Sequence, residues 1–390
     1  MVLTLAERIG IKEKINKVKE KEGKLSDFEK FGIIKTEGSS KEIHEWIDSF
    51  VPPFTKEELE KYYQNPELFL QYGQKNMELF LEICEILKEY ATVVLSENFS
   101  KKERDTALLM GLHLVFTASD MFYKHDRFLE ISSPEISPFG KVYNEISKII
   151  EKVAKLKNYD EKWKNEKLFI LLTMPSFASL RVRLFLDCST ILKKYSLFGK
   201  LKSLRKREEI MALIRKDSQI CKEIEELSNK YKITSEVIID ILSILSPEDF
   251  RNIEEHLKKS LEKVNETFNE LKIVLGTEDY KKLKENYEKI KYFKELQEYT
   301  SLILKSPVSM EAIGKMISAI DYLKENMLYL VKEEYIEEIK EALKSFEEGL
   351  PLGDFYFVPR LRKISYLLLK KGYLKEEARA DYERELEVWK

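Results

Sequence analysis

The chain has 390 residues, of which 43% are hydrophobic and 35% charged, and its formal net charge at pH 7 is −2. A chain of this length can bury a large core or form two to three ordinary domains, so its stability requires neither a disulfide framework nor a metal. The composition argues against a disordered chain and excludes a polycation, so any attraction to nucleic acid must come from local patches of charge.

Several features favour a soluble, cytoplasmic protein without a membrane partner. The three cysteines, Cys84, Cys188 and Cys221, are widely spaced and odd in number, which indicates buried thiols in a reducing compartment. The N-terminal segment has no apolar core of signal-peptide length, and charges interrupt the chain at intervals shorter than a membrane span. Lys and Glu predominate while only five Gln occur, a composition associated with thermophiles.

Apolar residues recur at three- and four-residue spacing along most of the chain, and only 13 Gly and 10 Pro interrupt them. This spacing is typical of amphipathic helices, so we predict an all-α fold, an elongated multi-helix bundle with two helical halves. In chain order, the predicted helices cover residues 3–22, 40–50, 55–63, 66–96, 100–130, 138–157, 160–173, 176–195, 200–216, 217–230, 234–245, 247–275, 277–304, 309–346 and 359–388.

Local signals mark several helix ends. Thr55 followed by Glu58 forms a capping-box pattern, and Ser246-Pro247 supplies an N-cap residue and a proline at the first helical position. Gly276 and the segment 347–359 are expected to interrupt helices, because glycine frees φ and proline lacks an amide donor. The aromatic residues 355–357 could instead form a short strand.

Two segments, 107–122 and 168–188, are much more apolar than their neighbours, which predicts helices at the centre of a large core. In residues 254–346 the sequence pattern predicts long helices rich in Lys and Glu. This pattern is typical of antiparallel helices with charged outer faces. We therefore predict an N-terminal helical core domain, residues 1–198, and a C-terminal helical domain, residues 199–390.

Residues 181–216 carry eleven cations and three acids, a net charge of +8. Clustered cations can neutralise phosphates and release counterions, which drives binding to DNA or RNA without sequence preference. The predicted nucleic-acid contacts are Arg181, Arg183, Lys200, Lys202, Arg205, Lys206, Arg207, Arg215 and Lys216. The alternative is that residues 200–216 form a solvated helix face opposite the acidic segment 331–349.

A second, smaller basic run follows near the C-terminal end. It contains six cations and no acid between residues 359 and 375: Arg360, Arg362, Lys363, Lys370, Lys371 and Lys375.

Residues 219–245 have the apolar spacing of a helix-turn-helix, with Ser228 as the small residue and Thr234 as a cap for the second helix. The second helix offers Ser235, Glu236, Asp240 and Ser243 as its outward residues, and no Arg, Lys, Asn or Gln occurs from 233 to 250. Major-groove readout depends mostly on those residue types, so we interpret the segment as a packing unit of helix-turn-helix shape.

The four histidines allow few catalytic arrangements. His113 and Asp120 are two helical turns apart, and the dipeptide His125-Asp126 follows. This dipeptide resembles the HD-type metal-dependent phosphohydrolases, and that resemblance implies further separated ligands, for which Asp187 and His44 are the candidates. In such a site, His and carboxylate ligands would hold a metal that activates water. The alternative is that His113 is a core histidine and that Asp120 bonds to a neighbouring side chain.

The sequence favours a non-enzymatic helical protein that binds DNA or RNA through its central basic stretch, as part of a larger assembly. No catalytic residue, metal or cofactor is predicted in this interpretation. A protein-protein scaffold and a helical metal-dependent phosphohydrolase are the two alternatives. Salt-dependent binding would separate the first two, and metal content would identify the third.

Overall fold

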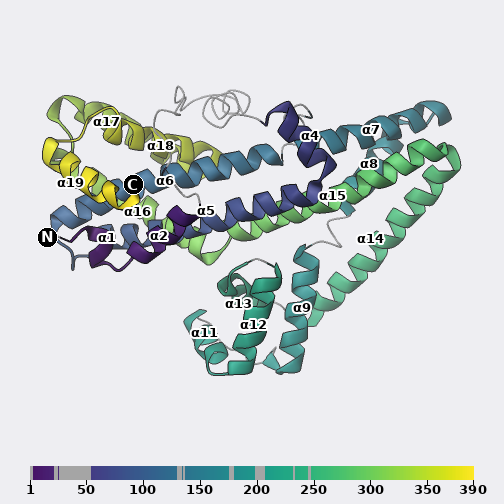
Figure 1. Ribbon diagram of the computed structural model, residues 1–390, viewed down its shortest axis with the longest axis horizontal. Coiled ribbons are helices and arrows are strands. Elements are labelled where there is room, and N and C mark those ends of the chain that lie inside the picture. The colour runs from purple at the N-terminus through teal and green to yellow at the C-terminus, as the bar shows by residue number, and fades with distance from the viewer. Residues whose placement is uncertain are drawn as a thin grey trace. The chain divides into compact units, whose positions relative to one another are not determined.

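The computed structural model describes residues 3–21, 54–129, 137–174, 180–197, 207–231, 233–244 and 247–390, together with residues 25 and 134. Within these ranges the chain is built of helices, and the only extended pairing is an isolated antiparallel bridge between Val331 and Leu374 (Figure 1). The predicted all-α multi-helix fold is confirmed.

The α-helices follow the predicted order closely. They are α1 (Leu5–Arg8), α2 (Lys12–Glu20), α4 (Lys56–Gln64), α5 (Pro66–Leu95), α6 (Lys101–Phe128), α7 (Pro138–Lys157), α8 (Glu161–Thr173), α9 (Leu180–Lys194), α11 (Arg207–Arg215), α12 (Ser218–Tyr231), α13 (Ser235–Ile244), α14 (Pro247–Val274), α15 (Thr277–Leu304), α16 (Pro307–Leu330), α17 (Ile336–Gly349), α18 (Asp354–Leu369) and α19 (Glu376–Leu386). The predicted helix 40–50 lies outside the described residues.

Predicted start signals act as expected. The Thr55 hydroxyl accepts a hydrogen bond from the amide of Glu58, and the Glu58 carboxylate accepts one from the amide of Thr55, which completes a capping box. Pro247 is the first residue of α14, and α15 begins directly after Gly276. Proline at this position costs no hydrogen bond, because the first amides of a helix have no partner within it.

Three predicted helices are interrupted in the structure. Residues 3–22 divide at Gly10 and residues 359–388 divide at Gly372, where positive φ angles of 74° and 80° end the helical path. Residues 309–346 divide after Leu330, because the next residue, Val331, pairs with Leu374 as an extended bridge. The possible strand at residues 355–357 was wrong, since these residues belong to α18.

The chain forms two compact units, each made of separate segments. Unit 1 comprises the described part of residues 1–53 with Asn76–His125 and Pro307–Lys390. Its central element is α6, in which every residue from Thr106 to Ser119 is buried. Helix α16 contacts α6 closely at Gly111, since the Met316 sulfur lies 2.9 Å from the position that a β-carbon on Gly111 would take.

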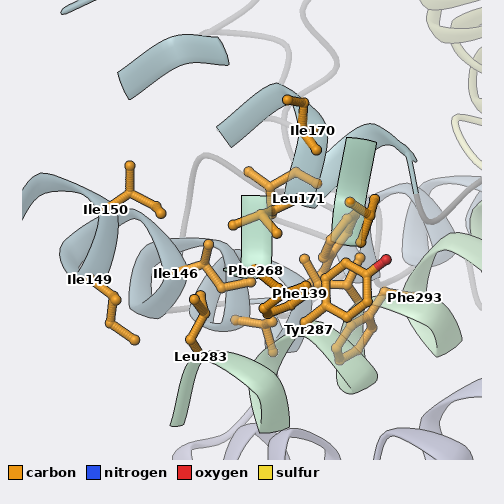
Figure 2. Packing of buried hydrophobic residues seen from close by; sticks show 14 of the residues in the cluster. Phe139, Ile146, Ile149, Ile150, Ile170, Leu171, Phe268, Leu283, Tyr287 and Phe293 are labelled. Carbon is orange, nitrogen blue, oxygen red and sulfur yellow. The ribbon is translucent and has the colours of Figure 1, made fainter. Parts of the chain in front are cut away.

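Unit 2 comprises Phe54–Lys75 and Asp126–Ser306. Helices α14 and α15 run antiparallel as a helical hairpin (Figure 1), and α15 packs against α7 while α14 packs against α8. The apolar core of unit 2 gathers side chains from these four helices, including Phe139, Ile146, Leu171, Phe268 and Phe293 (Figure 2).

This division differs from the predicted boundary at 198/199, which falls inside unit 2. The two strongly apolar segments also belong to different units, since 107–122 lies in unit 1 and 168–188 in unit 2. Hydrophobic patterning identifies a buried helix but not the distant helices that bury it, and this is why the linear division differs.

Candidate nucleic-acid interface

The described residues of the basic stretch lie on or beside α9 and α11, which form a cluster with α12 and α13 in unit 2. Four of the nine predicted contact residues lie outside the described residues: Lys200, Lys202, Arg205 and Lys206. Arg181 in α9 and Arg207 in α11 have described backbones only. The remaining three can be placed in full: Arg183, Arg215 and Lys216.

Part of the positive charge of α9 is paired with acids of unit 2. The Arg183 guanidinium lies 2.8 Å from the Glu295 carboxylate of α15. Lys194 forms an ion pair with Glu223 of α12, and its hydrogen bond lowers the pKa of Glu223. These two cations are therefore paired with acids of unit 2.

Arg215 and Lys216 differ, because both are exposed and neither forms an ion pair with the described residues. Ile210 and Ile214 of α11 are buried, so the end of this helix is anchored, while its last residue, Arg215, and the following residue, Lys216, are exposed. The next residue, Asp217, accepts hydrogen bonds of 3.0 and 3.3 Å from two backbone amides in the first turn of α12. Its carboxylate is thus used to cap α12.

The segment with helix-turn-helix spacing forms two helices, α12 and α13, joined by a short turn. The Ser228 hydroxyl donates to the carbonyl of Ile233 at 2.6 Å, and the amide of Ile233 donates back to the carbonyl of Ser228 at 3.3 Å. These two bonds close the turn, and buried Ile224 and Val237 lie on the helices to either side.

Helix α13 is largely enclosed by α9, α11 and α12. Its residues 237–239, 241 and 242 are buried, and the predicted outward residues Asp240 and Ser243 are half-buried. A recognition helix must present a solvent-facing row of polar side chains to the major groove. Among its described side chains, α13 has no such row.

The second basic run does not form a uniform positive surface. Arg362 has no exposed side-chain surface, and its Nη1 atom lies 2.7 Å from a carboxylate oxygen of Asp120. Its guanidinium carbon also lies 4.3 Å from the ring centroid of Phe116. In addition, Arg360 donates to the Ser345 hydroxyl at 3.1 Å. Sequence reasoning missed this buried role, because a cation among other cations carries no local sign of burial.

His113 and His125, the two described histidines of unit 1, are core residues. His113 Nδ1 lies 2.5 Å from the Tyr382 hydroxyl, and both side chains are buried. His125 has no exposed surface, and desolvation lowers its pKa to about 3, so it is neutral at pH 7. Asp120 faces Arg362, as the alternative of a bond to a neighbouring side chain expected.

The metal site of the phosphohydrolase alternative finds no support in the part of the chain that the structure describes. No group of three or more His, Cys, Asp or Glu side chains there could hold a metal ion. Asp187 belongs to unit 2, where it accepts hydrogen bonds from Lys230 at 2.6 Å and from Tyr231 at 2.7 Å. His44 and the side chain of Asp126 lie outside the described residues.

A second buried charge that sequence reasoning missed is Glu385 of α19. Its carboxylate accepts hydrogen bonds from the amides of Leu5 and Ala6, both at 2.7 Å, and from the Tyr90 hydroxyl at 2.8 Å. Three donors satisfy the buried carboxylate, so it joins α1 and α5 to α19 within unit 1. This arrangement is structural and leaves no oxygen directed at a substrate.

One helix, Lys101–His125, is long and apolar enough to cross a membrane by length and composition. The structure buries 83% of the qualifying window inside the protein. Burial of this kind is typical of the central helix of a helical core.

Comparison with protein-family models, with curated proteins and with solved structures found no match to this chain. A proposal for its function therefore depends on the geometry and charge described above.

Proposed function

We propose that the protein binds the phosphate backbone of DNA or RNA through the exposed cations of the α9–α13 cluster, as a non-enzymatic component of a larger assembly. The observation that supports this proposal is the pair Arg215 and Lys216, which is exposed and unpaired among the described residues at the anchored end of α11. The net charge of +8 over residues 181–216 would reinforce the attraction.

Contact with phosphates predicts a definite dependence on salt. Each phosphate contact with duplex DNA contributes about 0.9 to the slope of log K against log salt. Removal of both cations should therefore weaken binding to any sequence and reduce the slope by about 2. Base-specific recognition is not expected, because α13 offers no described row of polar side chains.

The test is a titration of the full chain against short single- and double-stranded DNA and RNA at several salt concentrations. Three proteins are compared: the natural sequence, Arg215→Glu/Lys216→Glu, and Lys258→Glu/Lys263→Glu. The last is a matched control, because these lysines are exposed on α14 of the same unit and the charge change is identical. Loss of binding in the first variant alone would support the proposal.

A third variant, Arg205→Glu/Lys206→Glu/Arg207→Glu, tests the remaining part of the basic stretch. Equal weakening in the α14 control would show that net charge, not this cluster, determines binding. Failure of the natural protein to bind at low salt would overturn the proposal.

A protein-protein scaffold is the second candidate, and one observation favours it. Leu328 and Tyr329, adjacent residues of α16 in unit 1, are 64% and 66% exposed. Exposed apolar pairs of this kind occur at protein interaction sites, although single exposed apolar residues are common. A Leu328→Ser/Tyr329→Ser variant that lost a salt-insensitive protein partner, while keeping its fold, would support this candidate.

A further inference from the structure

Unit 2 contains a small hollow that is lined by aromatic side chains, by polar side chains and by one lysine amine. Its volume is about 240 Å³, and its lining comes from three helices: Phe139 and Tyr143 of α7, Asn165, Phe169 and Leu172 of α8, and Lys294 of α15. Ligand pockets for drug-sized molecules usually measure about 300–1,000 Å³, so this one suits a smaller molecule.

The aromatic wall is held in place by the core of the unit. Phe139 is 2% exposed and stacks on Phe293, with ring centroids 5.3 Å apart and planes 13° apart (Figure 2). Tyr143 is half-buried, whereas Phe169 is 56% exposed and can shift toward a ligand. A planar ring could therefore enter between a fixed aromatic side chain and an adaptable one.

The amine of Lys294 lies 5.6 Å from the centroid of the Phe139 ring. It donates to the Gln297 amide oxygen at 3.1 Å, and no ion pair joins it to an acid of the described residues. Burial lowers the pKa of Lys294, and the carboxylate of Glu298 only partly opposes this. An anion in the hollow would supply a counter-charge to this half-buried amine, where ionic attraction is stronger than in bulk water.

We propose that this hollow binds a small aromatic carboxylate of the benzoate class, with the carboxylate on the Lys294 ammonium and the ring against Phe139 and Phe169. Asn165, at the exposed edge, can donate a second hydrogen bond to the carboxylate. This site is independent of the proposed nucleic-acid interface, because it shares no residue with it.

The experiment follows 4-fluorobenzoate by fluorine NMR as the full chain is added, with neutral 4-fluorobenzamide as the matched ligand. Saturable binding of the carboxylate is expected, with clearly weaker binding of the amide. Lys294→Met keeps most of the aliphatic stem and removes the charge, so it should weaken carboxylate binding by about tenfold or more. Lys291→Met is the control, because that exposed lysine of the same helix pairs with Glu288 instead.

Phe169→Ala provides a second variant that should keep its fold, because Phe169 is more than half exposed. It should weaken the carboxylate and the amide alike, since it removes contact with the ring. The proposal is overturned by absence of saturable binding, by equal binding of the two ligands, or by unchanged binding in a folded Lys294→Met variant.

Discussion

Asp120 and Arg362 form an ion pair in which the cation has no exposed surface and the carboxylate side chain is 23% exposed. Removal of one partner of a buried ion pair takes its compensating charge away from the other, which usually costs about 3–5 kcal/mol. We expect Asp120→Asn to lower the free energy of unfolding by about 3 kcal/mol. This value is at the lower end of that range because Asp120 is partly exposed to solvent. Urea unfolding at pH 7 measures this change.

The double variant Asp120→Asn/Arg362→Met is the control for this pair. Replacement of the cation by an apolar side chain removes the buried charge that has lost the Asp120 carboxylate, so the double variant should be more stable than Asp120→Asn alone. If Asp120→Asn and the double variant unfolded at the same urea concentration, the destabilisation caused by Asp120→Asn would not come from the buried guanidinium.

The buried His125 should make the folded protein less stable at acidic pH. Burial holds its pKa at about 3, below its ordinary value of 6.5. The unfolded chain therefore binds a proton more readily, and the stability present above pH 6.5 is lost as the pH falls toward 3. As the pH falls below 6.5, the free energy of unfolding of His125→Phe should decrease less steeply than that of the natural protein. The difference between the two slopes should be about 1.4 kcal/mol per pH unit.

Unfolding of the natural protein, His125→Phe and His256→Gln at pH 7.0, 6.0, 5.0 and 4.0 measures these slopes. His256 is exposed on α14, so its replacement should leave the slope of the natural protein unchanged. Parallel curves for His125→Phe and the natural protein would contradict a buried neutral histidine.

At the scale of helices, α5 and α15 approach closely at Gly73. A β-carbon at this position would lie 2.5 Å from both terminal carbons of Leu296, which is itself fully buried. Alanine improves helix propensity by about 1 kcal/mol, whereas forced overpacking costs about 1–3 kcal/mol. We expect Gly73→Ala to destabilise the protein by about 1 kcal/mol, measured as a lower thermal midpoint.

Gly314→Ala is the matched substitution on α16. No heavy atom lies within 4 Å of the position a β-carbon would take, and the residue is exposed. Only the propensity gain remains, so this variant should be more stable by about 0.5–1 kcal/mol. Destabilisation by both substitutions would indicate a backbone effect common to helical glycines instead of a steric one.

At the scale of the whole molecule, the two units are assembled from segments far apart in the chain. Unit 1 needs both Asn76–His125 and Pro307–Lys390, because α6 contacts α16 and the buried pair joins α6 to α18. Unit 2 needs α7 and α8 to cover α14 and α15. Separate fragments 1–198 and 199–390 should therefore have low helicity and melt without cooperativity.

Circular dichroism of each fragment and of their mixture tests this arrangement. Mixing should restore helicity, because each fragment exposes apolar surface that the other covers. A cooperative melt of either fragment alone, with the helical signal per residue of the full chain, would contradict the interleaved units.

The sequence by itself determined the helical fold and most helix ends. Apolar spacing and local caps such as Thr55 with Glu58 depend on neighbouring residues only, so they can be read without knowledge of the fold. The interruptions at Gly10, Gly372 and Val331 were missed, because glycine tolerates a helix and the bridge to Leu374 depends on a distant partner.

Only the tertiary structure decided which charges are exposed and which helices share a core. Arg362 and Arg215 both lie in basic runs, yet Arg362 is buried beside Asp120 while Arg215 faces solvent. Likewise, the sequence does not distinguish Lys294 from other lysines, and only the packing of three helices places it in a hollow lined by aromatic side chains. Burial and pairing arise from contacts between segments far apart in the chain, and local patterns do not record those contacts.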